Sequence, residues 1–446
     1  MSSYVRIKSD GNTDWFYYDR FGMFIHFGLY ALPARGEWVQ NFELIDNETY
    51  NKYFEHFNPD LINAKEWAKR AKEAGMKYAI LTTKHHEGFC LWDTKYTEFK
   101  VTNTPYKKDI VREFVDAFKA EGLKVGFYYS LLDWNSKLFP IDAFHPLCEH
   151  PNAEKMNEDR DMKKYAEYMR NQVTELLTNY GKIDILWFDF SYLNQTADDI
   201  GDNTYDWMQF GGGKGKDQWE SEKLIETCRS IQPWVIINNR CGIDQDIWTP
   251  EQYQCTEWPR HPETGELVCW ETCQTFSGSW GYYHDQHSWK SPKLLIDLLI
   301  NTVALGGNLI MNVGPTSRGY IDKRAENSLA VYADWMKYNS RSIYGCTMAE
   351  SEFIPPVGTR LTQSEDGSRL YIHLIEYPAT RCLTMRGLAG KIDYAQFLHD
   401  GSEILYRDGS DGFTRVGMDN TDDVVVFNMP VLVGDIIDPV IEVFLK

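Results

Sequence analysis

Two hydrophobic patterns alternate along most of the chain: amphipathic segments of helical period, and short apolar runs that end in polar residues. The first amphipathic segment places its apolar residues on one helical face: Trp67, Ala68, Ala71 and Ala74. Gly75 is suited to end this helix in the left-handed conformation, and the apolar run 78–81 follows it. The pattern predicts a helix followed by a buried strand.

The same unit recurs along the chain. An amphipathic helix with Asp109 as its N-cap ends near Gly122 and precedes "KVGFYYS". Further units end in "IDILWFD", "WVIINNR" up to Arg240, and "NLIMNVG", and the strand "GMFIHFG" opens the series. Near-continuous apolar strands separated by helices predict a parallel sheet covered on both faces, with right-handed crossovers. Six or more units before residue 345 favour a (β/α)8-like barrel over an open sheet.

The helical period disappears after about residue 346. "RLYIHLIEY", "DYAQFL", "DVVVFNM" and "VIEVFLK" are short, rich in β-formers and separated by turns. We therefore expect a catalytic-type barrel over residues 1–345 and a C-terminal antiparallel β-sandwich over 346–446. Tyr371 and Phe397 would form a carbohydrate platform if they lay on the surface of the sandwich, although alternating aromatic residues there are more often core.

Polar residues collect where the predicted barrel strands end. Side chains at the carboxyl ends of barrel strands share one mouth, where the chemistry of such barrels takes place. The residues placed there by the pattern are His26, His85, His86, Tyr129, Asp189, Asn239 and Arg240.

Asp189 is the first candidate for chemistry. It ends the strand "ILWFD", where a carboxylate can act as a nucleophile or a general base; the alternative is an N-cap of the next helix. Cleavage of a glycosidic bond needs a second carboxyl group, and the downstream candidates are Glu251, Glu257 and Glu271.

The histidines allow three interpretations: metal ligands, partners of sugar hydroxyl groups, or core residues. Adjacent His85 and His86 lack the H-x-H spacing of strand zinc sites and the i, i+4 spacing of helical ones. Neutral imidazoles around a hydroxylated ligand fit better, and we expect no metal and no cofactor. The sequence also lacks G-x-S-x-G, a dinucleotide fingerprint and a Walker loop.

Composition limits the classes of molecule that this protein is expected to bind. The net charge of -19 disfavours nucleic acid and anionic membrane, and the 15% aromatic content suits ligands that stack on rings. The nine cysteines show no C-x-x-C spacing, and "MSSYVRIKSDG" lacks an apolar signal core. We expect a cytoplasmic protein as the chain is given, secreted or periplasmic if a leader was removed. The oligomeric state stays open, a homo-oligomer included.

Six motifs, in order, resemble the α-L-fucosidases of glycoside hydrolase family 29. They lie between about Phe21 and Tyr344 and read "FGMFIHFGLYALPARGEW", "KYAILTTKHHEGFCLWDTK", "GFYYSLLDW", "ILWFD", "WETCQTFSGSWGY" and "GGNLIMNVGP". The resemblance implies a retaining exo-glycosidase that removes terminal α-L-fucosyl residues from an oligosaccharide or glycoconjugate, on the two-domain architecture already predicted.

The resemblance also implies roles for particular residues. Asp189 falls on the nucleophile, and Glu251 is preferred as the acid/base, with Glu271 as its rival. The residues expected to hold the sugar are His26, Glu37, Trp38, His85, His86, Tyr129, Trp187, Arg240 and Trp280. Phe190 and Ser191 follow Asp189 where many relatives have Gly, which we expect to narrow the leaving-group side of the pocket.

Two other classes of function remain open on the sequence. One is a metal-dependent hydrolase on the same barrel, which would lose activity to a chelator. The other is a non-catalytic fucose-binding protein, which would bind the sugar without turnover.

Overall fold

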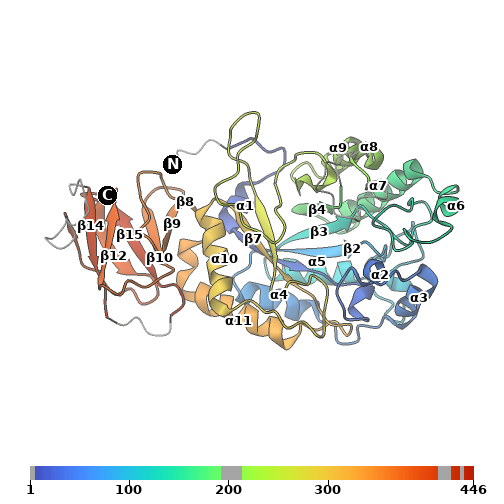
Figure 1. The fold of residues 1–446 in the computed structure, drawn as a ribbon, viewed down its shortest axis with the longest axis horizontal. Helices are drawn as coiled ribbons and strands as arrows, with labels where there is room; N and C mark the ends of the chain where they lie inside the picture. The colour runs from blue at the N-terminus through green and yellow to red at the C-terminus, as the bar shows by residue number, and fades with distance from the viewer. Residues whose placement is uncertain (1–5, 192–212, 410–422, 432–435) are drawn as a thin grey trace.

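The computed structural model describes residues 6–191, 213–409, 423–431 and 436–446. A parallel sheet of seven strands forms the centre of the first part of the chain (Figure 1). In spatial order its strands are β5 (Ile236–Ile237), β4 (Ile185–Asp189), β3 (Lys124–Ser130), β2 (Tyr78–Lys84), β1 (Phe21–Ile25), β7 (Asn308–Val313) and β6 (Glu271–Thr275). These strands are almost wholly buried, as expected where helices cover the outer face.

Helices surround this sheet. They are α1 (Asp14–Asp19), α2 (Val39–Phe42), α3 (Asn47–His56), α4 (Ala64–Glu73), α5 (Ile110–Ala120), α6 (Ala153–Asn157), α7 (Met162–Asn179), α8 (Lys216–Trp219), α9 (Ser221–Ile231), α10 (Pro292–Ala304) and α11 (Lys323–Asn339). The predicted helix ends are confirmed. The Asp109 side chain caps α5 by accepting from the amide of Arg112. Gly75 and Gly122 have φ of +84° and +79°, the left-handed conformation expected just after a helix.

The curled sheet is closed between β5 and β6 by a short extended segment, 247–251. Isolated parallel bridges join Asn238 to Ile247, Trp248 to Trp270, and Glu251 to Cys273. The amide of Trp248 donates to the carbonyl of Cys269, and the amide of Glu271 donates back to that of Trp248. A (β/α)8-like barrel was therefore the right prediction, with this segment standing where the eighth strand is expected.

The prediction that the fifth strand runs to Arg240 was wrong, because the strand is shorter. β5 ends at Ile237, and Asn239–Cys241 forms a 3-10 turn. The cause is Asn238, whose side-chain amide donates to the carbonyl of Phe188 and accepts from its amide, both at 2.9 Å. The side chain thus replaces the backbone ladder with β4 and lets the chain turn before Arg240.

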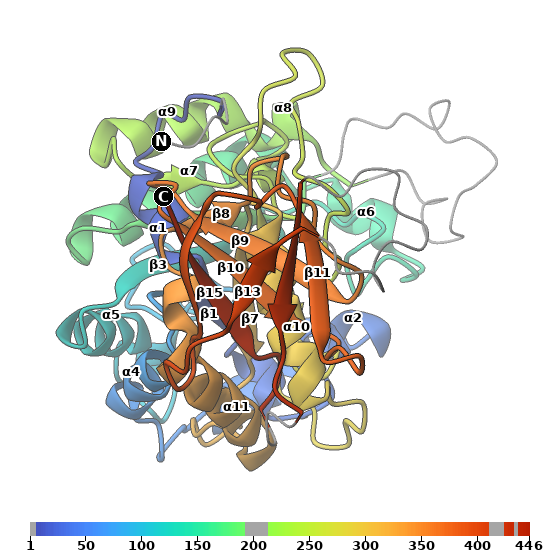
Figure 2. The ribbon, with the colours of Figure 1, turned by 90° about the vertical axis from the view of Figure 1, so that its left-hand side faces the viewer.

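Two antiparallel sheets follow the barrel (Figure 2). One has the order β12 (Ile392–Phe397), β15 (Val440–Leu445), β10 (Arg369–Leu374), β9 (Thr359–Ser364), β8 (Cys346–Met348), and the other β11 (Cys382–Arg386), β14 (Val424–Asn428), β13 (Tyr406–Asp408). The two sheets share one apolar core, as in the predicted sandwich. Tyr371 and Phe397 are both buried, so neither is a surface platform.

The sandwich packs beside α10 and α11 of the barrel (Figure 1). The indole of Trp335 donates to the carbonyl of Ile437, and Arg341 pairs with the buried Glu442 at 2.9 Å. In the described part of the chain, no helix combines the length and the apolar character that a bilayer crossing requires.

Candidate active site

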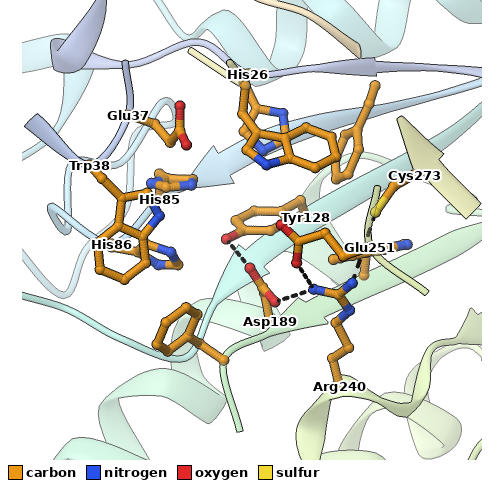
Figure 3. Close-up of a pocket in the computed structure, with 14 residues that line it drawn as sticks. His26, Glu37, Trp38, His85, His86, Tyr128, Asp189, Arg240, Glu251 and Cys273 are labelled. Carbon is orange, nitrogen blue, oxygen red and sulfur yellow. Dashed lines mark hydrogen bonds and ion pairs between the residues drawn. The ribbon is translucent and has the colours of Figure 1, made fainter. Parts of the chain in front are cut away.

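A pocket opens at the carboxyl ends of the barrel strands (Figure 3). The residues that line it are Phe24, His26, Glu37, Trp38, His85, His86, Tyr128, Trp187, Asp189, Phe190, Arg240, Glu251, Cys273 and Trp280. The structure thus brings together side chains from segments more than 250 positions apart in the sequence. Ten of the eleven residues named from the sequence as preferred catalytic or sugar-binding groups lie in this pocket.

Asp189 ends β4 and points into the pocket, with its side chain only 14% exposed. Tyr128 donates a hydrogen bond of 2.9 Å to Oδ2, and Nη1 of Arg240 donates one of 3.0 Å to Oδ1. Burial raises the pKa of Asp189, and the charge of Arg240 opposes that shift. Both oxygens are therefore fixed in direction by donors from neighbouring barrel segments.

Arg240 also holds Glu251. The same nitrogen, Nη1, donates 2.7 Å to Oε2 of Glu251, whose side chain is 47% exposed. Thr249 anchors the guanidinium through its hydroxyl and carbonyl, both at 2.9 Å, and the ring of Trp187 lies 4.6 Å from it.

The two carboxylates are close because they share one nitrogen. Their bonded oxygens can be no farther apart than the two hydrogen bonds laid end to end. That limit is below the roughly 6.5 to 9.5 Å that inverting glycosidases leave between carboxyl groups, and it admits the roughly 5 to 5.5 Å of retaining ones.

Glu271 does not reach the pocket. It is fully buried on β6, where Tyr78 donates 2.5 Å to one oxygen and the indole of Trp187 donates 3.1 Å to the other. Cys273, two positions later on the same strand face, does line the pocket, so Glu271 lies one layer beneath its floor. Burial raises the pKa of Glu271 to about 7.

The three histidines lie together on one side of the pocket (Figure 3). Nδ1 of His26 contacts Oδ1 of Asn312, and Nδ1 of His86 contacts the hydroxyl of Ser130, both at 2.6 Å. Burial lowers the pKa of His26 to about 3 and the pKa values of His85 and His86 well below their usual range. All three imidazoles are therefore neutral at pH 7, and two of them leave Nε2 for a ligand.

Glu37 and two tryptophans complete the walls. Glu37 accepts 2.8 Å from the amide of Gly281, and burial raises its pKa. The ring of Trp280 lies 5.1 Å from that of His26, and Trp38 stands edge-on to His86 at 4.8 Å. The site thus combines hydrogen-bonding groups on one side with flat apolar surface, which suits a deoxy sugar.

Tyr129 is a correction. Its hydroxyl donates 2.7 Å to Gln172 of α7, on the outer face of β3, whereas Tyr128 faces the pocket. Successive strand side chains point to opposite faces, so only one of these tyrosines can reach the mouth. The pairing of Tyr128 with Trp187 across β3 and β4 puts Tyr128 on the pocket face.

Two other lining residues were missed in the sequence. Phe24 lies two positions before His26, and Cys273 two positions after Glu271, so strand alternation was the available signal. Phe190, the residue after Asp189 that we expected to narrow the pocket, does line it, and its φ of +82° takes it out of the strand pattern.

A (β/α)8-like barrel with two close carboxylates at its mouth, beside neutral imidazoles and tryptophans, defines a glycoside hydrolase. The family model described as alpha-L-fucosidase matches residues 3–341, and the chain belongs to this family, glycoside hydrolase family 29.

Relatives and solved structures agree with this assignment. The chain is 29% identical to an alpha-L-fucosidase of Dictyostelium discoideum, over 76% of this chain and 73% of that one. Its fold matches alpha-L-fucosidase isoenzyme 1 from Paenibacillus thiaminolyticus with a TM-score of 0.86 and 40% identity, over 97% of this chain and 98% of that one.

A second solved structure bears on the reaction. A family 29 α-L-fucosidase from Bacteroides thetaiotaomicron, captured as a trapped covalent intermediate with 2-fluoro-fucosyl fluoride, matches with a TM-score of 0.80 and 26% identity, over 100% of this chain and 99% of that one. A covalent intermediate is the signature of a retaining glycosidase.

Proposed function

We propose that this protein is a retaining exo-α-L-fucosidase that removes terminal α-L-fucosyl residues from glycans through a covalent intermediate on Asp189. The observation that carries the proposal is the shared nitrogen of Arg240, which holds Asp189 and Glu251 at a separation suited to double displacement. The covalent intermediate trapped in the Bacteroides relative supports the same course.

In the first step an oxygen of Asp189 attacks the anomeric carbon of the bound fucosyl residue. The bond from that carbon to the leaving oxygen breaks, and Glu251 donates its proton to this oxygen. The exposed position of Glu251 at the rim suits a group that must meet a leaving group of variable size. The product of this step is a fucosyl ester of Asp189.

In the second step Glu251, now a carboxylate, removes a proton from water. The water oxygen bonds to the anomeric carbon while the ester bond to Asp189 breaks, and fucose leaves with its original configuration. Tyr128 and Arg240 remain to stabilise the carboxylate of Asp189 as it departs, because both donate to its oxygens.

The shape of the pocket supports removal of terminal residues. Phe24, Tyr128 and Trp187 come from the barrel strands below the mouth and are almost fully buried, so the floor is closed. A closed floor admits a sugar at the end of a chain, whereas an internal residue would need two open ends.

Glu251 is preferred over Glu271 as acid/base on geometry. Only Glu251 lines the pocket and contacts the arginine that holds Asp189. Both oxygens of Glu271 accept from buried donors beneath the floor, out of reach of a leaving oxygen.

The test is release of nitrophenol from p-nitrophenyl α-L-fucoside by the wild type, by Asp189→Ala, and by Asp393→Ala as a control on an exposed strand position of the sandwich. We expect turnover in the wild type and the control, loss of about 10⁴-fold or more in Asp189→Ala, and partial recovery with azide. A parallel assay with EDTA tests the metal-dependent alternative: loss on chelation and return with zinc would overturn the proposal.

Specificity for terminal residues is tested with two oligosaccharides that differ only in whether the fucosyl residue is capped by a further sugar. Release of fucose from the uncapped compound alone is expected. Equal cleavage of both would contradict exo-action while leaving the displacement on Asp189 intact.

A further inference from the structure

A buried carboxyl group that the proposed mechanism does not use lies next to His85. The side chain of Glu87 is only 1% exposed and does not line the pocket. Among the described residues neither of its oxygens accepts or donates a hydrogen bond of normal geometry, and the amides of Glu87 and Leu29 come near enough only to lower its pKa. An unpartnered buried carboxyl group is rare in proteins, because its lost hydration is then uncompensated.

His85 also has a buried polar atom without a hydrogen-bond partner in the part of the chain that the structure describes. Its Nδ1 also lacks a partner within the described part of the chain, although Nδ1 of His26 and of His86 each has one. The nearest acidic oxygen is Oε2 of Glu87, 3.7 Å away, which is just beyond hydrogen-bond distance. The remaining contacts of the His85 ring are with other rings: it stacks on Tyr128 and stands edge-on to Tyr30.

The chain keeps space for the Glu87 carboxyl group. A Cβ at Gly28 would lie 2.6 Å from Oε1 of Glu87. Gly28 has an extended backbone with φ of −178°, a conformation open to any residue, so its conformation does not require glycine. The absence of a side chain at this position is what admits the carboxyl group beside His85.

Glu87 is protonated at neutral pH, so its carboxyl group can donate a hydrogen bond. Burial raises its pKa to about 8, although the amides of Glu87 and Leu29 lower it; of the nearby ion pair, Asp133 raises the pKa and Lys84 lowers it. The phenols that face it, Tyr30 and Tyr50, have pKa values raised well above 10 by burial and stay neutral throughout. At pH 7 Glu87 is therefore mostly a neutral acid.

We propose that Glu87 is a positioning residue for His85: its carboxyl group closes onto Nδ1 when the sugar binds and so fixes which ring nitrogen carries the proton. With Glu87 protonated, its O–H donates to Nδ1, and Nε2–H of His85 is left to donate to a hydroxyl of fucose. A closure of less than about 1 Å suffices, within the tightening expected when a ligand enters an empty site.

Ionisation of Glu87 reverses the arrangement. The carboxylate can only accept, so Nδ1 must carry the proton and Nε2 becomes an acceptor. A fucose hydroxyl bound in the first arrangement then loses its donor. Sugar binding should weaken as the pH rises through about 8, for a reason that resides in Glu87 and not in the catalytic carboxylates.

The experiment compares wild type, Glu87→Gln and Glu87→Leu between pH 6 and 9.5, with two readouts: the inhibition constant of L-fucose, and kcat/KM for p-nitrophenyl α-L-fucoside. Gln keeps the shape and a donor but cannot titrate. We expect Glu87→Gln to bind fucose within about threefold of wild type at pH 7 and to lack the alkaline rise of the inhibition constant. Glu87→Leu should bind fucose about 10- to 100-fold more weakly than wild type at pH 7, with an inhibition constant that shows no alkaline rise, since a misplaced positioning group costs on that order.

Glu175→Gln is the matched control, because Glu175 is another buried glutamate, bonded to Trp92 outside the pocket. It should retain the wild-type pH profile. An alkaline rise that persists in Glu87→Gln would overturn the inference, as would normal fucose binding by Glu87→Leu. If Glu87→Leu does not fold, the profile of Glu87→Gln decides.

The inference rests on the proposed function, because it assigns His85 to a sugar hydroxyl, but the two fail differently. A wild type that neither binds nor releases fucose would overturn both. A wild type that turns over normally beside unaffected Glu87 variants would overturn the role of Glu87 alone.

Discussion

The hydroxyl group of Tyr128 donates a hydrogen bond of 2.9 Å to Oδ2 of Asp189. The two residues lie on adjacent parallel strands, where Ser130 pairs with Asp189 and Tyr128 with Trp187. Tyr128 therefore reaches up from below the end of β4 and fixes one oxygen of the carboxylate while Arg240 fixes the other. This fixes the carboxylate in the direction from which it would attack a sugar held above it.

Tyr128→Phe should lower kcat/KM for aryl fucosides about tenfold to a hundredfold, because Asp189 loses a donor that orients it and stabilises its departure. Tyr129→Phe is the matched control. It removes a buried hydrogen bond to Gln172 on the other face of the same strand, so it should leave kcat/KM within about twofold and lower stability by about 1–2 kcal/mol. Steady-state kinetics with thermal unfolding separates the two effects. A larger kinetic loss in Tyr129→Phe would contradict the assignment of faces.

Glu251→Ala should reduce turnover of substrates with poor leaving groups by about 10²- to 10⁴-fold, because they depend on proton donation. An activated leaving group such as dinitrophenol should depend on it far less. Azide should then yield fucosyl azide of retained configuration from Glu251→Ala. Glu271→Gln, measured beside it, should show no such dependence on the leaving group. The reverse pattern would make Glu271 the acid/base.

Most of the fold follows from periodicity, and the exceptions have identifiable causes. The buried strands β2, β3, β4 and β7 lie where continuous apolar runs predict them. The early end of β5 could not be read from "WVIINNR", because it depends on the side chain of Asn238 reaching across to Phe188. The closing segment 247–251 has no apolar run of its own and is held by isolated bridges to its neighbours.

Some features of the site also follow from the sequence, and others depend on tertiary contacts. His26, His85, His86, Asp189 and Arg240 follow from polar residues at strand ends. Tyr129 was a wrong prediction because side chains alternate between the two faces of a strand, and this alternation puts Tyr128 on the pocket face of β3. Carboxylate separation, by contrast, depends on how far the loop after β5 brings Glu251 back toward β4. Only the contacts of Arg240 reveal that.

Phe190 should control the size of the leaving group. It follows Asp189 with φ of +82°, and its ring packs against Trp38, His86 and Phe144 along one wall of the pocket. A bulky residue in this backbone region is strained by about 1–3 kcal/mol, so we expect the ring itself to serve the site. Phe190→Gly should raise kcat/KM for a fucosyl oligosaccharide relative to p-nitrophenyl fucoside by about fivefold or more. An unchanged ratio would mean that the ring does not bound the leaving-group side.

Glu271 should make the stability of the protein depend on pH. Its pKa is about 7 in the folded state and near 4.5 when unfolded, because burial disfavours the charged form. Below pH 4.5 the group is protonated in both states, and its contribution to stability is fully present. As the pH rises through about 7 the unfolded state binds fewer protons than the folded state, so stability is lost.

Glu271→Gln removes this titration while keeping a polar group beneath Trp187. The free energy of unfolding, measured by urea denaturation between pH 4.5 and 8, should therefore fall less steeply with pH in the variant than in the wild type. The difference in total decline should be on the order of 3 kcal/mol, since one pKa unit corresponds to about 1.4 kcal/mol. Other groups with raised pKa values, such as Glu87 and Asp438, are present in both proteins, so their contributions to the pH dependence cancel in the comparison. Parallel pH profiles for the two proteins would show that Glu271 keeps an ordinary pKa in the folded state.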